Sequence, residues 1–157
     1  MSDTNRIISL VLDEATVGRR SPDVEHERRI AIYDLLEENS FALSGLDDGP
    51  YAIRLSIIDR RLHFEIRNES DVVLTTIALS LTPFRKIVKD YLSVCETYFS
   101  AIKTAASAQI EAIDMGRRSL HDEGSEILRT RLAEKVEIDF GTARRLFTLI
   151  CVLHIRH

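Results

Sequence analysis

A short stretch in the second half of the chain combines a carboxylate, two guanidiniums and an imidazole at helical spacing. The residues are Asp114, Arg117, Arg118 and His121, and Glu123 follows them closely. In a helix, such spacing places the first four side chains on neighbouring turns of one face. The guanidiniums would bind an anion, and the imidazole would move a proton. We therefore predict a site for a small anionic ligand, although an ion-pair network that orients two helices would use the same residues.

A second candidate site, for a metal, comprises Asp23, His26 and Glu27. On a helix, this spacing presents carboxylates and an imidazole on one side, where they would ligate a metal. Di-metal helical bundles repeat a Glu-x-x-His motif on paired helices. This chain has Asp23 in place of the Glu and shows no second copy of the motif. Acidic residues in a first helical turn are also expected because they complement the positive end of the helix dipole. Metal binding and simple dipole compensation both remain open, and the sequence identifies no cofactor.

A third, weaker candidate is the start of the last expected helix. Gly141, Arg144 and Arg145 lie there and would hold one phosphate on free backbone N–H groups. Asp139 would compete for those groups as a helix cap. The chain has no phosphate-cradling glycine-rich loop, no Gly-x-Ser-x-Gly elbow, no His-Glu-x-x-His and no paired Cys-x-x-Cys. No motif therefore predicts a particular reaction.

The composition argues against a general nucleic-acid binder. The 157 residues carry a net charge of −4, although 17 of the 21 basic residues are arginine and ten of these form five Arg-Arg pairs. A nucleic-acid-binding domain normally has a strong basic excess. Several of the pairs are interleaved with acids, as in residues 23–29, which is typical of a solvated helix face. We expect no nucleic-acid partner.

The cysteines and the apolar runs predict a cytoplasmic protein. Cys95 and Cys151 lie far apart in apolar surroundings, so we expect reduced core residues rather than a disulfide framework. The first residues lack the pattern of a signal peptide. The longest apolar run, residues 146–155, is about half of the ~20 residues that a bilayer span needs. We therefore expect no membrane association.

Hydrophobic periodicity predicts an α+β fold in one domain over residues 1–157. Strands are expected at 7–12, 51–57, 62–67 and 72–79, because apolar and polar residues alternate there. Helices are expected at 21–38, from 82 to about 104, at 108–134 with a possible interruption near Gly124, and at 139–154. Residues 136–138 form a small strand or a linker. The result is a mostly antiparallel sheet of about four strands, packed on a bundle of about four helices.

Two helices stand out by their apolar residues. The helix from residue 82 carries an apolar stripe from Phe84 to Ile102, the strongest periodic signal in the chain, and is predicted to be the central helix. Ser107 is expected to cap the helix that follows, and Gly116 is expected to let that helix approach a neighbour closely. The last helix is apolar nearly all round, so it must lie at the centre of the fold or in a subunit interface.

Four blocks of the sequence resemble a known bacterial family. They are SPDVEHERR at 21–29, LTPFRKIVKDY at 81–91, IDMGRRSLHDEG at 113–124 and FGTARRLF at 140–147. They are similar to uncharacterised protein family 0262, and the resemblance covers nearly the whole chain. It implies a stand-alone bacterial cytoplasmic protein of about this length. It implies no activity, ligand or catalytic residue.

Two functions from different classes follow. The first is a non-catalytic interaction or regulatory protein that acts as a homo-oligomer, with a homodimer expected, because catalytic motifs are missing and the last helix is apolar on every side. The alternative is a small enzyme or binding protein for an anionic, phosphorylated or nucleotide-like metabolite that uses Asp114, Arg117, Arg118 and His121. Whether the protein is an enzyme stays open.

Overall fold

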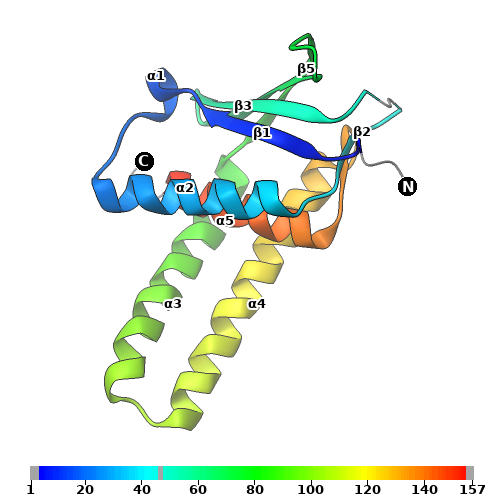
Figure 1. The fold of residues 1–157 in the computed structure, drawn as a ribbon. Coiled ribbons are helices and arrows are strands. Elements are labelled where there is room, and N and C mark those ends of the chain that lie inside the picture. The colour runs from blue at the N-terminus through cyan, green and yellow to red at the C-terminus, as the bar shows by residue number, and fades with distance from the viewer. Residues whose placement is uncertain (1–3, 46–47, 155–157) are drawn as a thin grey trace.

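The computed structural model describes residues 4–45 and 48–154 and contains a four-stranded sheet, a two-stranded sheet and a set of helices (Figure 1). In chain order the elements are β1 (Ile7–Leu12), α1 (Glu14–Val17), α2 (Pro22–Glu37), β2 (Phe41–Leu43), β3 (Tyr51–Ile58), β4 (Arg61–Arg67), β5 (Val73–Ser80), the 3₁₀ turn η1 (Thr82–Phe84), α3 (Arg85–Thr104), α4 (Ser107–Leu132), β6 (Val136–Ile138) and α5 (Phe140–His154). The α+β class and the predicted strands are confirmed.

The main sheet has the order β1-β3-β4-β5. Strands β3, β4 and β5 form an antiparallel meander, and β1 adds to it in parallel with β3. Alternation explains which side faces inward: Leu62, Phe64 and Ile66 of β4 are buried, as are Ile53 and Leu55 of β3. The outer face of the sheet is open to solvent (Figure 1). The expected mostly antiparallel sheet is therefore present, together with a small sheet of β2 and β6. Of the two alternatives for residues 136–138 the structure shows the strand, β6, whereas β2 was not predicted.

Helix α5 lies at the centre of the fold. It packs against α2 and α4, and Figure 1 shows it beneath the sheet and behind α2. Most of its residues are buried, namely Thr142, Ala143, Leu146, Phe147, Leu149, Ile150, Cys151 and Leu153. The opposite side, with Arg144, Arg145, Thr148 and Val152, is half-buried or exposed. This confirms that the last helix is buried, and of the two positions predicted for it the structure shows the centre of the fold.

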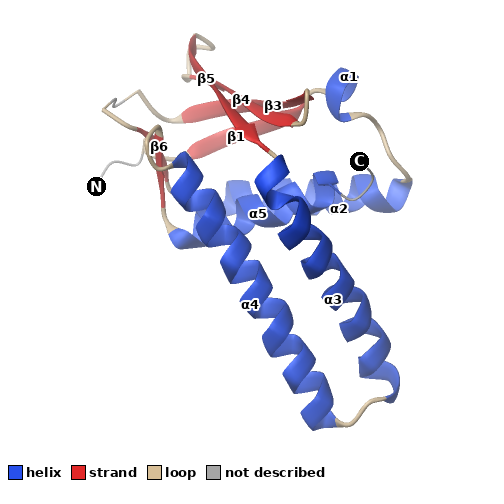
Figure 2. Cartoon of the chain, turned by 180° about the vertical axis from the view of Figure 1, so that it is seen from behind, coloured by secondary structure: helices blue, strands red, loops and turns tan. Residues whose placement is uncertain are grey.

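The prediction that α3 is the central helix is wrong. Helices α3 and α4 form a hairpin that projects away from the sheet (Figure 2). All residues from 89 to 120 are described, and within this range Ala101 alone is buried. Phe99 is 63% exposed and Ile102 is 48% exposed, although both belong to the predicted core stripe. The periodicity correctly indicated a helix with one apolar face, but the outer half of that face is exposed at Phe99 and Ile102.

Two expectations for α4 also need correction. The N-cap residue is Ala106 and not Ser107, which is the first residue of the helix. The helix continues through Gly124 to Leu132 without interruption. Gly116 has open space where a Cβ would stand, whereas a Cβ on Gly124 would lie 2.2 Å from the Phe147 ring. The close approach of two helices is therefore real, but it occurs at Gly124.

The start of α2 agrees with the helix that the sequence predicts at 21–38. The Ser21 hydroxyl accepts a hydrogen bond from the Val24 amide at 3.3 Å, and Pro22 stands in the first turn. Arg28 of α2 is buried, and its Nη1 donates to the Gly18 carbonyl at 2.7 Å and to Glu25 at 3.1 Å. Among the described residues, no helix is long and apolar enough to cross a membrane.

Candidate functional site

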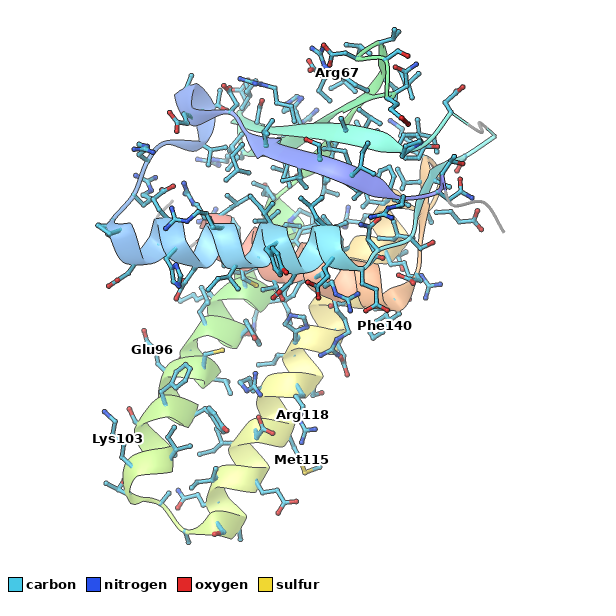
Figure 3. All side chains as sticks on the ribbon, in the orientation of Figure 1. Arg67, Glu96, Lys103, Met115, Arg118 and Phe140 are labelled. Atoms are coloured by element: carbon cyan, nitrogen blue, oxygen red, sulfur yellow. The ribbon has the colours of Figure 1, made fainter. Side chains whose placement is uncertain are left out.

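Four arginines from two helices line one cavity at the base of the hairpin. Its volume is about 340 Å³, and we call it the arginine cavity. Its walls are Tyr91 of α3, Arg117, Arg118 and His121 of α4, and Gly141, Arg144, Arg145 and Thr148 of α5. Figure 3 shows Arg118 on α4 and Phe140, the first residue of α5, on the same side of the molecule. The predicted α4 cluster and the Arg-Arg pair of the last helix therefore meet in space.

The two arginines of α4 share one carboxylate. Arg117 donates to Asp114 Oδ1 through Nε at 3.0 Å and Nη2 at 2.5 Å, and Arg118 Nη2 lies 3.1 Å from Asp114 Oδ2. The hydrogen bond from Arg117 is the main reason that the pKa of the Asp114 carboxyl lies below its usual value. Arg117 also lies over the Tyr98 ring, 5.1 Å from its centroid. The helical spacing thus produces the ion pairs that it predicted.

The two arginines of α5 each have a carboxylate partner from another element. Arg144 bonds to Asp122 of α4, and Arg145 Nη2 lies 3.1 Å from Glu38 Oε2, just after α2. Four guanidiniums therefore face three carboxylates: Asp114, Asp122 and Glu38. None of these carboxylates lines the cavity. The cavity wall is consequently cationic, with the compensating charge outside it.

The first turn of α5 brings its backbone to the cavity. Asp139 caps the helix by accepting a hydrogen bond from the Thr142 amide at 2.8 Å, as predicted. Gly141 lines the cavity in this turn, and a Cβ placed there would lie 3.2 Å from the Arg145 guanidinium. A side chain at position 141 would therefore require that guanidinium to shift by a few tenths of an ångström.

His121 forms part of the cavity floor and is 7% exposed. Its Nε2 lies 2.8 Å from the Thr148 hydroxyl, which in turn donates to the Arg144 carbonyl at 3.1 Å. Because the hydroxyl proton is used there, Nε2–H must donate to Thr148. The imidazole also makes edge contacts with the Tyr91 and Phe147 rings, at centroid separations of 5.2 and 5.1 Å.

The surroundings of His121 favour the neutral imidazole. Burial is the main cause that lowers its pKa from 6.5 to about 4, and the positive charge of Arg144 adds to the effect. Near neutral pH the ring is therefore uncharged, and its one N–H is already bonded to Thr148. This geometry favours a role in holding Thr148 and Arg144 in place over the proton transfer that the residue type suggested.

The remaining predicted residues lie elsewhere. Glu123 is exposed and does not line the arginine cavity. Asp23, His26 and Glu27 are all exposed on α2. Across residues 4–45 and 48–154, no group of three or more His, Cys, Asp or Glu side chains is placed to hold a metal ion. Metal binding at α2 stays a prediction, and no geometry supports it.

Two wall residues were not predicted from the sequence. Tyr91 was assigned to the apolar stripe of its helix, and its phenol now borders the cavity. Burial raises the pKa of Tyr91 to about 12. Thr148 is a polar residue within the apolar last helix, and this interruption was the available signal.

The chain belongs to a bacterial protein family. The model of the uncharacterised protein family UPF0262 matches residues 4–156. A UPF0262 protein of Nitrobacter hamburgensis is 59% identical over 150 residues, which are 96% of this chain and 92% of that protein. A UPF0262 protein of Rhodospirillum rubrum is 57% identical over 156 residues, which are 99% of this chain and 96% of that protein. No solved structure matches the chain.

Proposed function

We propose that this protein binds a small molecule with a phosphate or carboxylate group in the arginine cavity. The observation that carries the proposal is the convergence of four arginines on a cavity whose lining, within residues 4–45 and 48–154, includes no carboxylate. Guanidiniums repel one another, and here four of them share only three carboxylate partners. Their planar forks match the oxygens of phosphate and carboxylate groups.

The charge balance supports a ligand with a low negative charge. The four guanidiniums exceed their three carboxylate partners by one positive charge. The cavity volume of about 340 Å³ lies within the usual range of ~300–1,000 Å³ for small-molecule sites. A concave site of this size suits a small ligand better than a nucleic-acid backbone. Binding without catalysis is the simplest assignment, since His121 is neutral and hydrogen-bonded.

A titration of inorganic phosphate by calorimetry tests this proposal. We expect Arg117→Gln and Arg144→Gln each to weaken phosphate binding at least about tenfold, because a hydrogen bond to a charged group contributes ~1.5–3 kcal/mol. Arg67→Gln is the matched control: Arg67 is also ion-paired, but it lies at the far end of the sheet (Figure 3). Absence of phosphate binding to the unmodified protein, or equal weakening by all three variants, would contradict the proposal.

A second candidate function is self-association through the α3–α4 hairpin. A two-helix hairpin that buries only Ala101 between residues 89 and 120 has little core of its own. Two such hairpins can complete a four-helix bundle. Because the apolar residues of α5 are largely buried within the fold, the predicted homodimer would use the exposed residues Ile102 and Met115 instead. We also propose a cytoplasmic location for this protein, which the free thiols of Cys95 and Cys151 fit.

Light scattering over a range of protein concentrations tests the dimer. We expect Ile102→Glu to convert a dimer into a monomer without lowering the stability of the monomer, because Ile102 is exposed there. Val73→Glu is the control, since Val73 has the same exposure of 48% and lies on the sheet. A protein that is monomeric at every concentration would rule out this candidate.

A further inference from the structure

A second cavity adjoins the arginine cavity. Its volume is about 470 Å³, it lies between α2, α3 and α5, and we call it the apolar groove. Its lining includes Ile30, Leu92, Cys95, Phe99, Cys151 and Val152. Burial raises the pKa of the Cys151 thiol, which is consistent with a dry, apolar floor. Leu92, Cys95 and Phe99 of the α3 stripe thus line the groove.

The two cavities have a common wall. Tyr91, Arg117 and Thr148 line both of them. The Arg117 guanidinium lies at this boundary, where it bonds to Asp114 and covers the face of the Tyr98 ring, which itself lines the groove. A molecule that bonds to Arg117 in the arginine cavity therefore lies directly beside an apolar surface.

The charges around the groove favour one orientation of such a molecule. Glu27 and Asp34 of α2 line the groove, and their carboxylates disfavour an anionic group there. The guanidiniums of Arg118, Arg144 and Arg145 line only the arginine cavity. The negative group of such a molecule is thus directed to the arginine cavity on one side of Arg117, and an uncharged group is directed to the apolar groove on the other side.

We propose that the ligand is amphipathic, with an anionic head in the arginine cavity and an uncharged alkyl or aromatic tail in the apolar groove. This inference rests on the proposed function, because the head occupies the same cationic site. It is supported by the shared wall, by the apolar lining and by the complementarity of charge at each end. Each volume lies in the range of small-molecule sites.

Calorimetric titration with methyl phosphate, hexyl phosphate and hexanol tests the inference. The two phosphates share a head and differ in the length of the tail. A fully buried methylene improves affinity by about fourfold, and the hexyl tail adds several methylenes. We therefore expect hexyl phosphate to bind at least about tenfold more tightly than methyl phosphate, even if the tail is only partly buried. Hexanol, which lacks the head, is expected not to bind measurably.

Variants of the groove locate the tail. Ile30→Asp and Phe99→Asp place a charge in the groove at exposed positions, where the fold tolerates it. We expect both to reduce the preference for hexyl phosphate to less than about threefold while methyl phosphate binds as before. The control Val73→Asp changes an exposed apolar residue that lines neither cavity, and it should keep the full preference.

The outcomes separate the two proposals. Equal binding of methyl and hexyl phosphate overturns the inference and leaves the anion site standing, whereas no binding of either phosphate overturns both. A preference that persists in Ile30→Asp and Phe99→Asp means that the tail lies elsewhere, and the inference is then wrong. If these variants instead dissociate a dimer and the unmodified protein shows no preference for hexyl phosphate, a second copy of the chain occupies the groove.

Discussion

Replacing Gly124 with alanine should destabilise the protein by about 3 kcal/mol, in the upper part of the range for overpacked cores. The added Cβ would stand 2.2 Å from Cζ of Phe147. That ring is fully buried and is flanked by His121 and Tyr91, so it cannot turn aside without displacing them. The loss would appear as a lower midpoint of urea unfolding at an unchanged slope.

The same substitution at Gly116, in the same helix, should have the opposite sign. A Cβ at this position meets no atom within 4 Å. Alanine is favoured over glycine in a helix by about 0.5–1 kcal/mol, so Gly116→Ala should stabilise the protein by roughly that amount. Equal effects of the two substitutions would mean that α4 and α5 are not in close contact at Gly124.

The second large effect is a loss of folding stability at acidic pH. Because the pKa of His121 falls from 6.5 to about 4 on folding, the native protein resists a proton that the unfolded chain accepts. Well above pH 6.5 neither state is protonated, and there His121 adds no pH dependence. As the pH falls from 6.5 towards 4, the unfolded state is increasingly favoured, and the cumulative loss of stability is about 3 kcal/mol.

The His121→Gln variant isolates this contribution. Its amide can still donate to Thr148, but it does not titrate. We expect the unfolding free energy of the variant to be lower at neutral pH, because the ring contacts are lost, and to change less between pH 6.5 and 4 than that of the unmodified protein. Carboxylates such as Asp114 titrate in both proteins and cancel in the comparison. Parallel pH profiles would show that His121 is protonated equally in both states.

The sequence predicts the local parts of this structure well. Alternation over Leu62, Phe64 and Ile66 determines the strand and its inner face, because side chains in a strand point to the two faces in turn. The spacing of Asp114, Arg117 and Arg118 likewise determines their ion pairs, since residues three and four apart meet on a helix. Both features depend only on neighbouring residues within one element.

The rest depends on how elements meet, and the sequence pattern does not contain that information. The stripe through Phe99 and Ile102 indicates an apolar helix face but not whether another element covers it, and here both side chains are exposed. Gly116 and Gly124 look alike in sequence, and only the position of Phe147 distinguishes them. The arginine cavity forms because the Arg144 turn of α5 packs beside His121 of α4.

The most direct test of the account is a titration of inorganic phosphate into isotope-labelled protein, followed by NMR of the backbone amides. If phosphate binds in the arginine cavity, we expect saturable shifts of the amide signals that concentrate on Gly141, Thr148 and the helical turn around Arg117. We expect no comparable shifts around Arg67 on the sheet. Shifts that spread over the surface without saturating, or that leave Gly141 and Thr148 unchanged, would contradict the assignment of this cavity as an anion site.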